Sequence, residues 1–254
     1  MTDEPGHTAS RNTMPTWSGP SQFPMTRWTL VVAAADPQRK EARSALVWLC
    51  ESYWYPLYAY VRRRGYPADQ AQDLTQQFFI RVLEGRYLDR ADPEKGRFRA
   101  FILTSLKFFL SDQADRDHAQ KRGGGTVLSL EISAGEERYQ REPAYNETPE
   151  RIFERRWALS LLDRVMDKLR DEFVQHGRLD HFNRLKVFLL DQGETPYAVL
   201  AREMHRSEGA LKVAIHRLRK RYRDLVRQEI AETVADPAEV EAELRFLAAA
   251  LTRK

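Results

Sequence analysis

The sequence lacks the features on which secreted and membrane-embedded folds depend. Among its 254 residues there is one cysteine, Cys50, so neither an internal disulfide nor a CxxC metal pair can form. No apolar run approaches the roughly 20 residues of a membrane span. The first residues carry no apolar core of a secretory signal. These absences predict a cytoplasmic protein without membrane insertion.

The sequence also lacks the signatures of catalysis and of cofactor binding. It contains neither a P-loop nor a GxGxxG motif. Asp180-His181 could form an acid–base pair, but no nucleophile pattern accompanies it. Asp112, Asp115 and His118 follow one another at one-turn spacing, but no second ligand cluster supports a metal ion. We therefore predict no enzymatic activity, no cofactor and no metal.

Charge is distributed unevenly, although the formal net charge is only +4. The stretch from His205 to Arg227 holds eight Lys or Arg residues against two acids. From Glu229 to Lys254 the balance reverses, with six acids against three bases. This asymmetry predicts an element that faces an anion, followed by an acidic segment.

Apolar residues recur at helical spacing through most of the chain, which predicts an all-α fold without strands. Pro56 is expected to kink or divide the helix that contains it. After a breaker-rich arm over 1–25, the predicted helices cover residues 28–35, 38–64, 68–84, 97–121, a stretch from Pro149 onward, 179–190 and 238–251.

The stretch from Thr195 to Arg227 predicts a helix-turn-helix. Thr195 and Pro196 suit a helix start, and Ser207 can cap a second helix after a three-residue turn. The second helix has an apolar stripe and a basic outer face, as entry into a DNA major groove requires. The alternative is an ordinary solvated helix face. The side chains placed to reach phosphates or base edges are Lys212, His216, Arg217 and Lys220.

Three stretches together resemble the bacterial sigma factors of RNA polymerase, in the extracytoplasmic-function group. Residues 53–83 contain the D-L-x-Q-x-F pattern of region two, and residues 92–122 open with D-P-x-x-G-x-F-R-A. Residues 195–225 are similar to region four, with S-E-G at 207–209 and H-R at 216–217. The chain departs from the family pattern at Phe108, where the family often has Asn, and at Val213-Ala214 in the second helix.

The resemblance implies a domain plan of two helical lobes. It comprises a disordered arm (1–25), a region 2-like domain (26–122), a linker (123–148), a region 4-like helix-turn-helix domain (149–234) and an acidic C-terminal helix (235–254). That last segment is expected to fold back on the lobes or to receive a regulator, such as an anti-sigma protein.

The resemblance also implies three sets of contacts. Asp73, Gln76 and Gln77 are expected on one exposed edge of their helix, which docks on the beta-prime clamp helices of core polymerase; the beta flap is a further expected partner. Single-stranded minus-ten DNA needs positive charge and a stacking surface. Arg97, Arg99 and Lys107 are expected as exposed bases of their helix, and Phe108 either stacks there or belongs to the core. The sets are Asp73, Gln76, Gln77 and Phe78 for core polymerase; Lys95, Arg97, Arg99, Lys107 and Phe108 for minus-ten DNA; and Ser207, Lys212, His216, Arg217 and Lys220 for minus-thirty-five DNA.

The predicted function is therefore that of a sigma factor, which binds core polymerase and directs promoter recognition and melting. A stand-alone helix-turn-helix regulator is the first alternative, and an interaction module that holds only a partner protein is the second. The Asp73–Phe78 edge separates the first two, because a plain repressor has no use for it.

Overall fold

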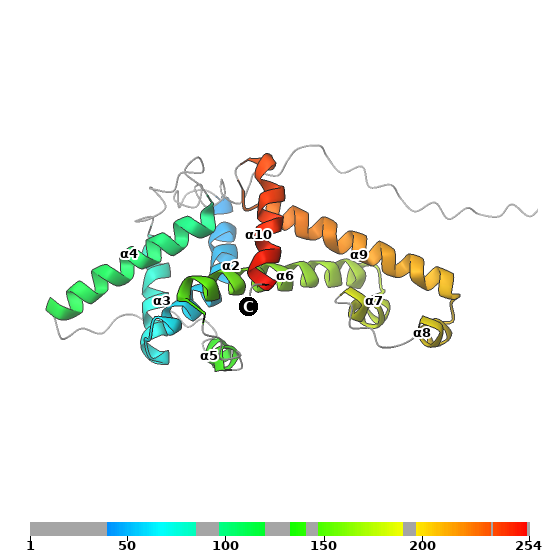
Figure 1. Ribbon diagram of the computed structural model, residues 1–254, viewed down its shortest axis with the longest axis horizontal. Helices are drawn as coiled ribbons and strands as arrows, with labels where there is room; N and C mark the ends of the chain where they lie inside the picture. The colour runs from blue at the N-terminus through cyan, green and yellow to red at the C-terminus, as the bar shows by residue number, and fades with distance from the viewer. Residues whose placement is uncertain are drawn as a thin grey trace, which may run out of the picture.

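The computed structural model describes residues 40–84, 97–119, 133–140, 147–189, 197–234 and 236–252. Within these ranges every regular element is helical, which confirms the predicted all-α class (Figure 1). The elements are α2 (Lys40–Arg63), α3 (Ala68–Leu83), α4 (Phe98–Ala119), α5 (Ser133–Gln140), α6 (Pro149–Gln175), α7 (Leu179–Leu185), the 3-10 helix Lys186–Leu189, α8 (Tyr197–Glu203), α9 (Glu208–Ala231), the 3-10 helix Pro237–Glu239 and α10 (Val240–Thr252).

Helix α2 continues through Pro56, so the expected division at this residue is wrong. A proline inside a helix removes one hydrogen bond and costs about 3 kcal/mol. The helix compensates by burial, because nearly every residue from Ser52 to Val61 is shielded from solvent. Tertiary packing against α3 and α6 therefore outweighs the local preference.

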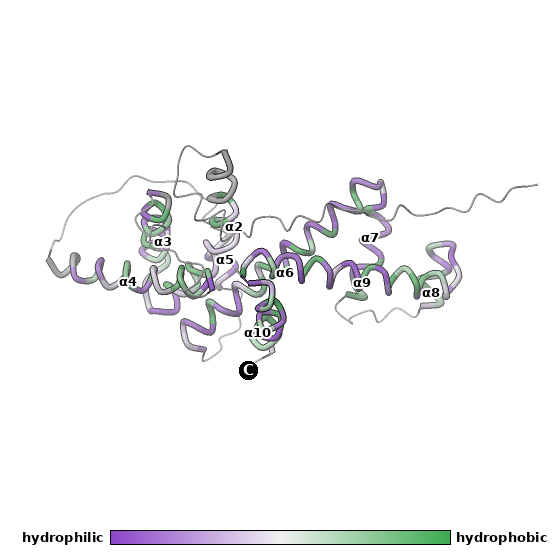
Figure 2. Tube along the Cα trace, turned by 90° about the horizontal axis from the view of Figure 1, so that it is seen from above, coloured by the Kyte–Doolittle hydropathy of each residue, from purple (hydrophilic) through white to green (hydrophobic). Residues whose placement is uncertain are grey.

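Helix α6 connects the two ends of the molecule (Figures 1 and 2). Thr148 caps it by accepting the backbone N–H of Arg151 at 3.3 Å. Its first turns face α2, where the Arg156 guanidinium lies 5.8 Å from the Tyr55 ring. Its last turns face α9, where Arg221 donates to Glu172 at 2.9 Å. The helix thus belongs to the packing of both ends.

Helix α5 was not predicted, because the sequence around it is charged and lacks sustained periodicity. It is held to α2 by Glu136, which accepts hydrogen bonds from Tyr58 and from Arg62 Nε, the latter at 3.1 Å. Gly135 allows this approach, because a Cβ atom there would meet the Trp54 ring at 2.7 Å. Long-range contacts therefore fix a helix whose own sequence is weakly helical.

Helix α10 folds back onto the rest of the chain, as expected for the acidic C-terminal segment. Asp236 caps the preceding 3-10 turn by accepting the Ala238 N–H at 2.8 Å. Val240 and Leu247 are buried against α6 and α9. The predicted arm over 1–25, the helix over 28–35 and the helix start at Thr195 and Pro196 lie outside the described residues.

The adjacent pair Phe108 and Phe109 on α4 gives a stability prediction. Phe109 is fully buried, with its ring 5.7 Å from that of Phe78, whereas Phe108 is 70% exposed. Phe109→Ala should lower the free energy of unfolding by about 3–5 kcal/mol. Phe108→Ala should change it by less than about 0.5 kcal/mol, because an exposed ring loses little packing. Urea unfolding measures both, and equal losses would contradict the assigned packing.

Candidate nucleic-acid and protein interfaces

The predicted helix-turn-helix is present as α8, a short turn and α9. Leu200 and Ala201 of α8 are buried, as are Leu211 and Ile215 of α9. Ser207 caps α9 as predicted, because its Oγ accepts the Ala210 N–H at 3.2 Å. Apolar contacts and the cap together fix the angle at which α9 leaves the turn.

The turn between these helices is a Schellman motif with a non-glycine residue at its left-handed position. The His205 N–H donates to Arg202 O at 3.0 Å, and the Arg206 N–H to Ala201 O at 2.9 Å. His205 has a φ of 52°. Gly177 occupies the same position in the turn after α6, with a φ of 66°. The turn thus places an exposed imidazole where glycine is the unstrained residue.

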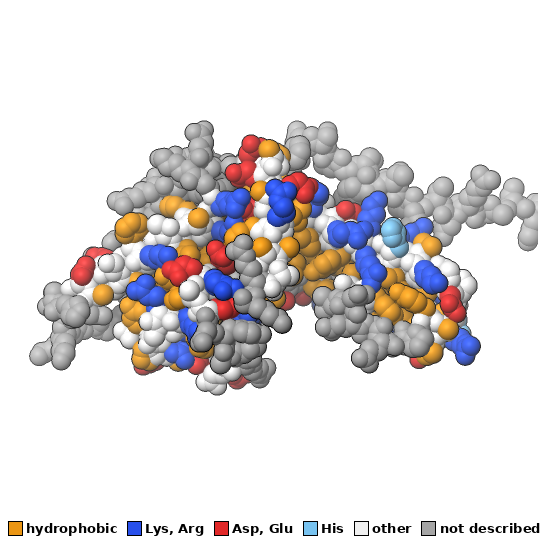
Figure 3. Space-filling view, viewed as in Figure 1, with side chains coloured by type: hydrophobic (Ala, Val, Ile, Leu, Met, Phe, Trp, Pro, Cys, Tyr) orange, Lys and Arg blue, Asp and Glu red, His pale blue; other side chains and the backbone are white. Residues whose placement is uncertain are grey.

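The basic residues of α9 divide into two sets. Arg219 Nε donates to Phe188 O at 2.9 Å, and Arg221 pairs with Glu172, a hydrogen bond that raises the pKa of Arg221. These two side chains therefore fasten α9 to the protein. Lys and Arg side chains gather over α9 in Figure 3. The second set stays exposed and includes Lys212, Arg217 and Lys220. Every residue predicted for minus-thirty-five DNA is exposed: these three, Ser207 and His216.

The predicted core-polymerase edge on α3 is only partly exposed. Asp73 and Gln77 are exposed, and Gln77 Oε1 accepts a hydrogen bond from Gln113 of α4 at 2.9 Å. Gln76 is 5% exposed and Phe78 is fully buried. The expected exposure of Gln76 is therefore wrong, because α3 packs against both α2 and α4 and leaves a narrower outer face.

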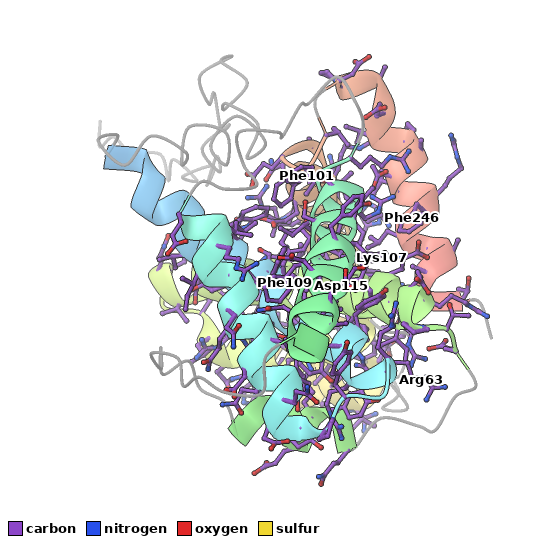
Figure 4. The ribbon with its side chains drawn as sticks, turned by 90° about the vertical axis from the view of Figure 1, so that its left-hand side faces the viewer. Arg63, Phe101, Lys107, Phe109, Asp115 and Phe246 are labelled. Atoms are coloured by element: carbon purple, nitrogen blue, oxygen red, sulfur yellow. The ribbon has the colours of Figure 1, made fainter. Side chains whose placement is uncertain are left out.

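The outer face of α4 presents an aromatic ring beside a cation. Phe108 is exposed, so its alternative assignment to the core is wrong. Lys107 Nζ lies 2.7 Å from Glu150 Oε1 on α6, and this hydrogen bond is the main cause that lowers the pKa of Glu150. Figure 4 shows Lys107 on α4 between Phe101 and Asp115. Lys95 lies outside the described residues.

Arg97 and Arg99, at the start of α4, point toward α10 and pair with Glu243. The sequence predicted them as exposed cations, but Arg99 is only 8% exposed. Its guanidinium lies 4.9 Å from the Trp157 ring and 3.8 Å from the Phe246 ring. Burial, followed by the repulsion of Arg97, lowers the pKa of Arg99 to about 10. Sequence periodicity could not reveal a partner 144 positions away.

The described residues hold no group of three or more His, Cys, Asp or Glu side chains that could bind a metal ion. The side chains of Asp117 and His118 are outside that set. Burial, with a smaller contribution from Glu51, raises the pKa of the Cys50 thiol to about 11. No helix in the described ranges is long and apolar enough to cross a membrane.

Comparison with known protein families gives a match to one segment of the chain. Residues 49–118 match the family model described as Sigma-70 region 2. The matched segment begins within α2, contains α3 and ends within α4. No curated protein and no solved structure matches the chain.

The turn of the helix-turn-helix gives a second prediction. His205→Gly should raise the free energy of unfolding by up to about 1 kcal/mol, because it removes left-handed strain from an L-residue. Gly177→Ala should lower it by about 1–2 kcal/mol for the opposite reason. A Cβ atom at Gly177 would meet nothing within 4 Å, so only backbone strain changes there. Chemical denaturation tests both, and a destabilised His205→Gly variant would contradict the turn geometry.

Proposed function

We propose that the chain is an RNA polymerase sigma factor that binds core polymerase and directs promoter recognition and melting. The observation that carries this proposal is the match of residues 49–118 to Sigma-70 region 2. A helix-turn-helix with an exposed basic second helix follows in the same chain, and the two features together support transcription initiation. Such a role places the protein in the bacterial cytoplasm.

For core polymerase, we propose that α3 supplies the contact with the beta-prime clamp helices. Asp73 and Gln77 offer short polar side chains at its surface, which suit arginine-bearing partners. Gln76 and Phe78 act from inside, because their burial fixes the rotation of α3 about its axis. The beta flap is the proposed partner of the helix-turn-helix.

For the minus-ten element, we propose that α4 receives a base after it leaves the DNA stack. The ring of Phe108 is 70% exposed and can stack on a base of any type. Lys107, the preceding residue, is exposed at the surface, and we propose that it exchanges its pairing with Glu150 for the DNA phosphates. Binding energy of the ordered complex separates the strands, so the step needs no cofactor.

For the minus-thirty-five element, we propose that α9 enters the major groove. Lys212, Arg217 and Lys220 are exposed cations that can reach phosphates or a guanine edge. Val213 is 50% exposed and offers an apolar contact for a thymine methyl group. Ser207 caps the helix at the end that would approach the bases. His216 is exposed on the same helix and is the fifth residue proposed to contact this element.

The finer assignments follow the resemblance. We propose that the chain belongs to the extracytoplasmic-function group, with residues 26–122 acting as region 2 and 149–234 as region 4. A stand-alone DNA-binding regulator is the second candidate, because the exposed cations of α9 would suffice for duplex binding without polymerase.

Co-elution of the full chain with purified bacterial core RNA polymerase on a sizing column tests the proposal. We expect a stable complex that is weakened at least about tenfold by the double change Asp73→Ala and Gln77→Ala, which corresponds to about 1.4 kcal/mol. Both side chains are exposed, so the double variant should fold normally.

The matched control is Asp167→Ala, which removes another exposed aspartate, on α6. It should leave the complex intact. If the chain fails to co-elute yet binds duplex DNA in a salt-dependent way, the sigma assignment is wrong and the stand-alone regulator is favoured.

A further inference from the structure

Helix α10 packs its apolar face on α6 and α9, and it contacts the start of α4 through Glu243 and Phe246. Val240 and Leu247 are buried, and the Phe246 ring lies 6.2 Å from that of Trp157 on α6. Figure 4 shows Phe246 on α10, and the Arg99 guanidinium at the start of α4 lies 3.8 Å from its ring centroid. The helix therefore occupies the surface next to the proposed minus-ten site.

Within this contact, Glu243 neutralises two cations at the start of α4, Arg97 just before the helix and Arg99 in its first turn. Its side chain is fully buried and pairs with both Arg97 and Arg99. The Arg99 guanidinium also lies over the Phe246 ring, so α10 supplies a counterion and an aromatic face to the same cation. Glu243 of α10 thus supplies the negative charge that DNA phosphates would supply to Arg97 and Arg99 in a complex.

Carboxylate and phosphate compete for the same guanidinium donors. Arg99 donates to one Glu243 oxygen through Nη1, and Arg97 Nε lies against the other oxygen, so a phosphate that takes these two nitrogens must displace the carboxylate. Arg97 and Arg99 directly precede the exposed part of α4 that carries Lys107 and Phe108. A strand laid along α4 would meet Glu243 at the first turn of the helix.

We propose that α10 is a built-in competitor of DNA, which keeps Arg97 and Arg99 paired with Glu243 until single-stranded DNA displaces it. This inference rests on the proposed function, because it assumes that α4 receives DNA. Displacement leaves α9 attached, because Glu229 holds α9 to α6 through Lys168 and Arg164 without any part of α10. The helix-turn-helix therefore keeps its place when α10 leaves.

The test compares two buried glutamates in the full chain. Glu243→Gln removes the charge at the α10 contact, and Glu229→Gln removes a matched charge, 1% exposed, between α6 and α9. Anisotropy of a labelled single-stranded oligonucleotide measures the affinity of each variant. We expect Glu243→Gln to bind more tightly than the wild type and Glu229→Gln to bind as the wild type does.

The salt dependence identifies the cause. Release of two arginines should steepen the fall of log affinity with log salt by about 1.4, since each phosphate contact on single-stranded DNA contributes about 0.7. The advantage of Glu243→Gln should therefore shrink about sevenfold between 50 and 200 mM salt. Adding Arg97→Gln should remove about half of the extra slope.

Phe246→Ala is the second variant, in case Glu243→Gln disturbs folding. It keeps every charge and removes only the ring that covers Arg99, so it should raise oligonucleotide affinity in the same direction. Equal affinity of both α10 variants and Glu229→Gln would overturn the inference. Failure of the chain to join core polymerase, with the Glu243→Gln gain intact, would overturn the sigma assignment and leave the competition between α10 and DNA standing.

Discussion

A guanidinium group shielded from water must have a counterion, and the placement of α10 depends on this constraint. An unpaired buried charge is strongly destabilising, so removal of one partner of such a pair typically costs about 3–5 kcal/mol. Arg99 is 8% exposed, and its counterion is Glu243, 144 positions later in the chain. The start of α4, the first third of α6 and α10 are consequently linked at Trp157.

The same arrangement separates structural cations from candidate DNA-binding cations. Arg99, Arg219 and Arg221 pair with oxygen atoms of the protein itself, a carboxylate for Arg99 and Arg221 and a backbone carbonyl for Arg219. Lys212 and Lys220 remain exposed on α9. A basic helix can therefore be attached firmly to its scaffold and still present charge to a polyanion. Arg97 and Arg99 belong to the structural cations while Glu243 of α10 pairs with them, and displacement of α10 would make them available to DNA.

The sequence predicted correctly those features that depend on residues close together in the chain. Apolar periodicity identified α3, α4 and α6, and side-chain chemistry identified the Ser207 cap. Prediction failed where distant residues decide the outcome. Examples are the continuity of α2 through Pro56, the existence of α5, and the burial of Gln76 and Arg99. Each of these depends on packing or pairing between elements that sequence periodicity does not relate.

Hydrogen exchange of the full chain, with and without a saturating single-stranded oligonucleotide at low salt, tests the central claim most directly. If α10 competes with DNA for Arg97 and Arg99, the backbone amides of α10 should be protected in the free protein and lose that protection in the complex. Those of α6 should keep theirs, because its contacts with α2 and α9 persist. Unchanged protection of α10 in an oligonucleotide-bound protein would contradict the account.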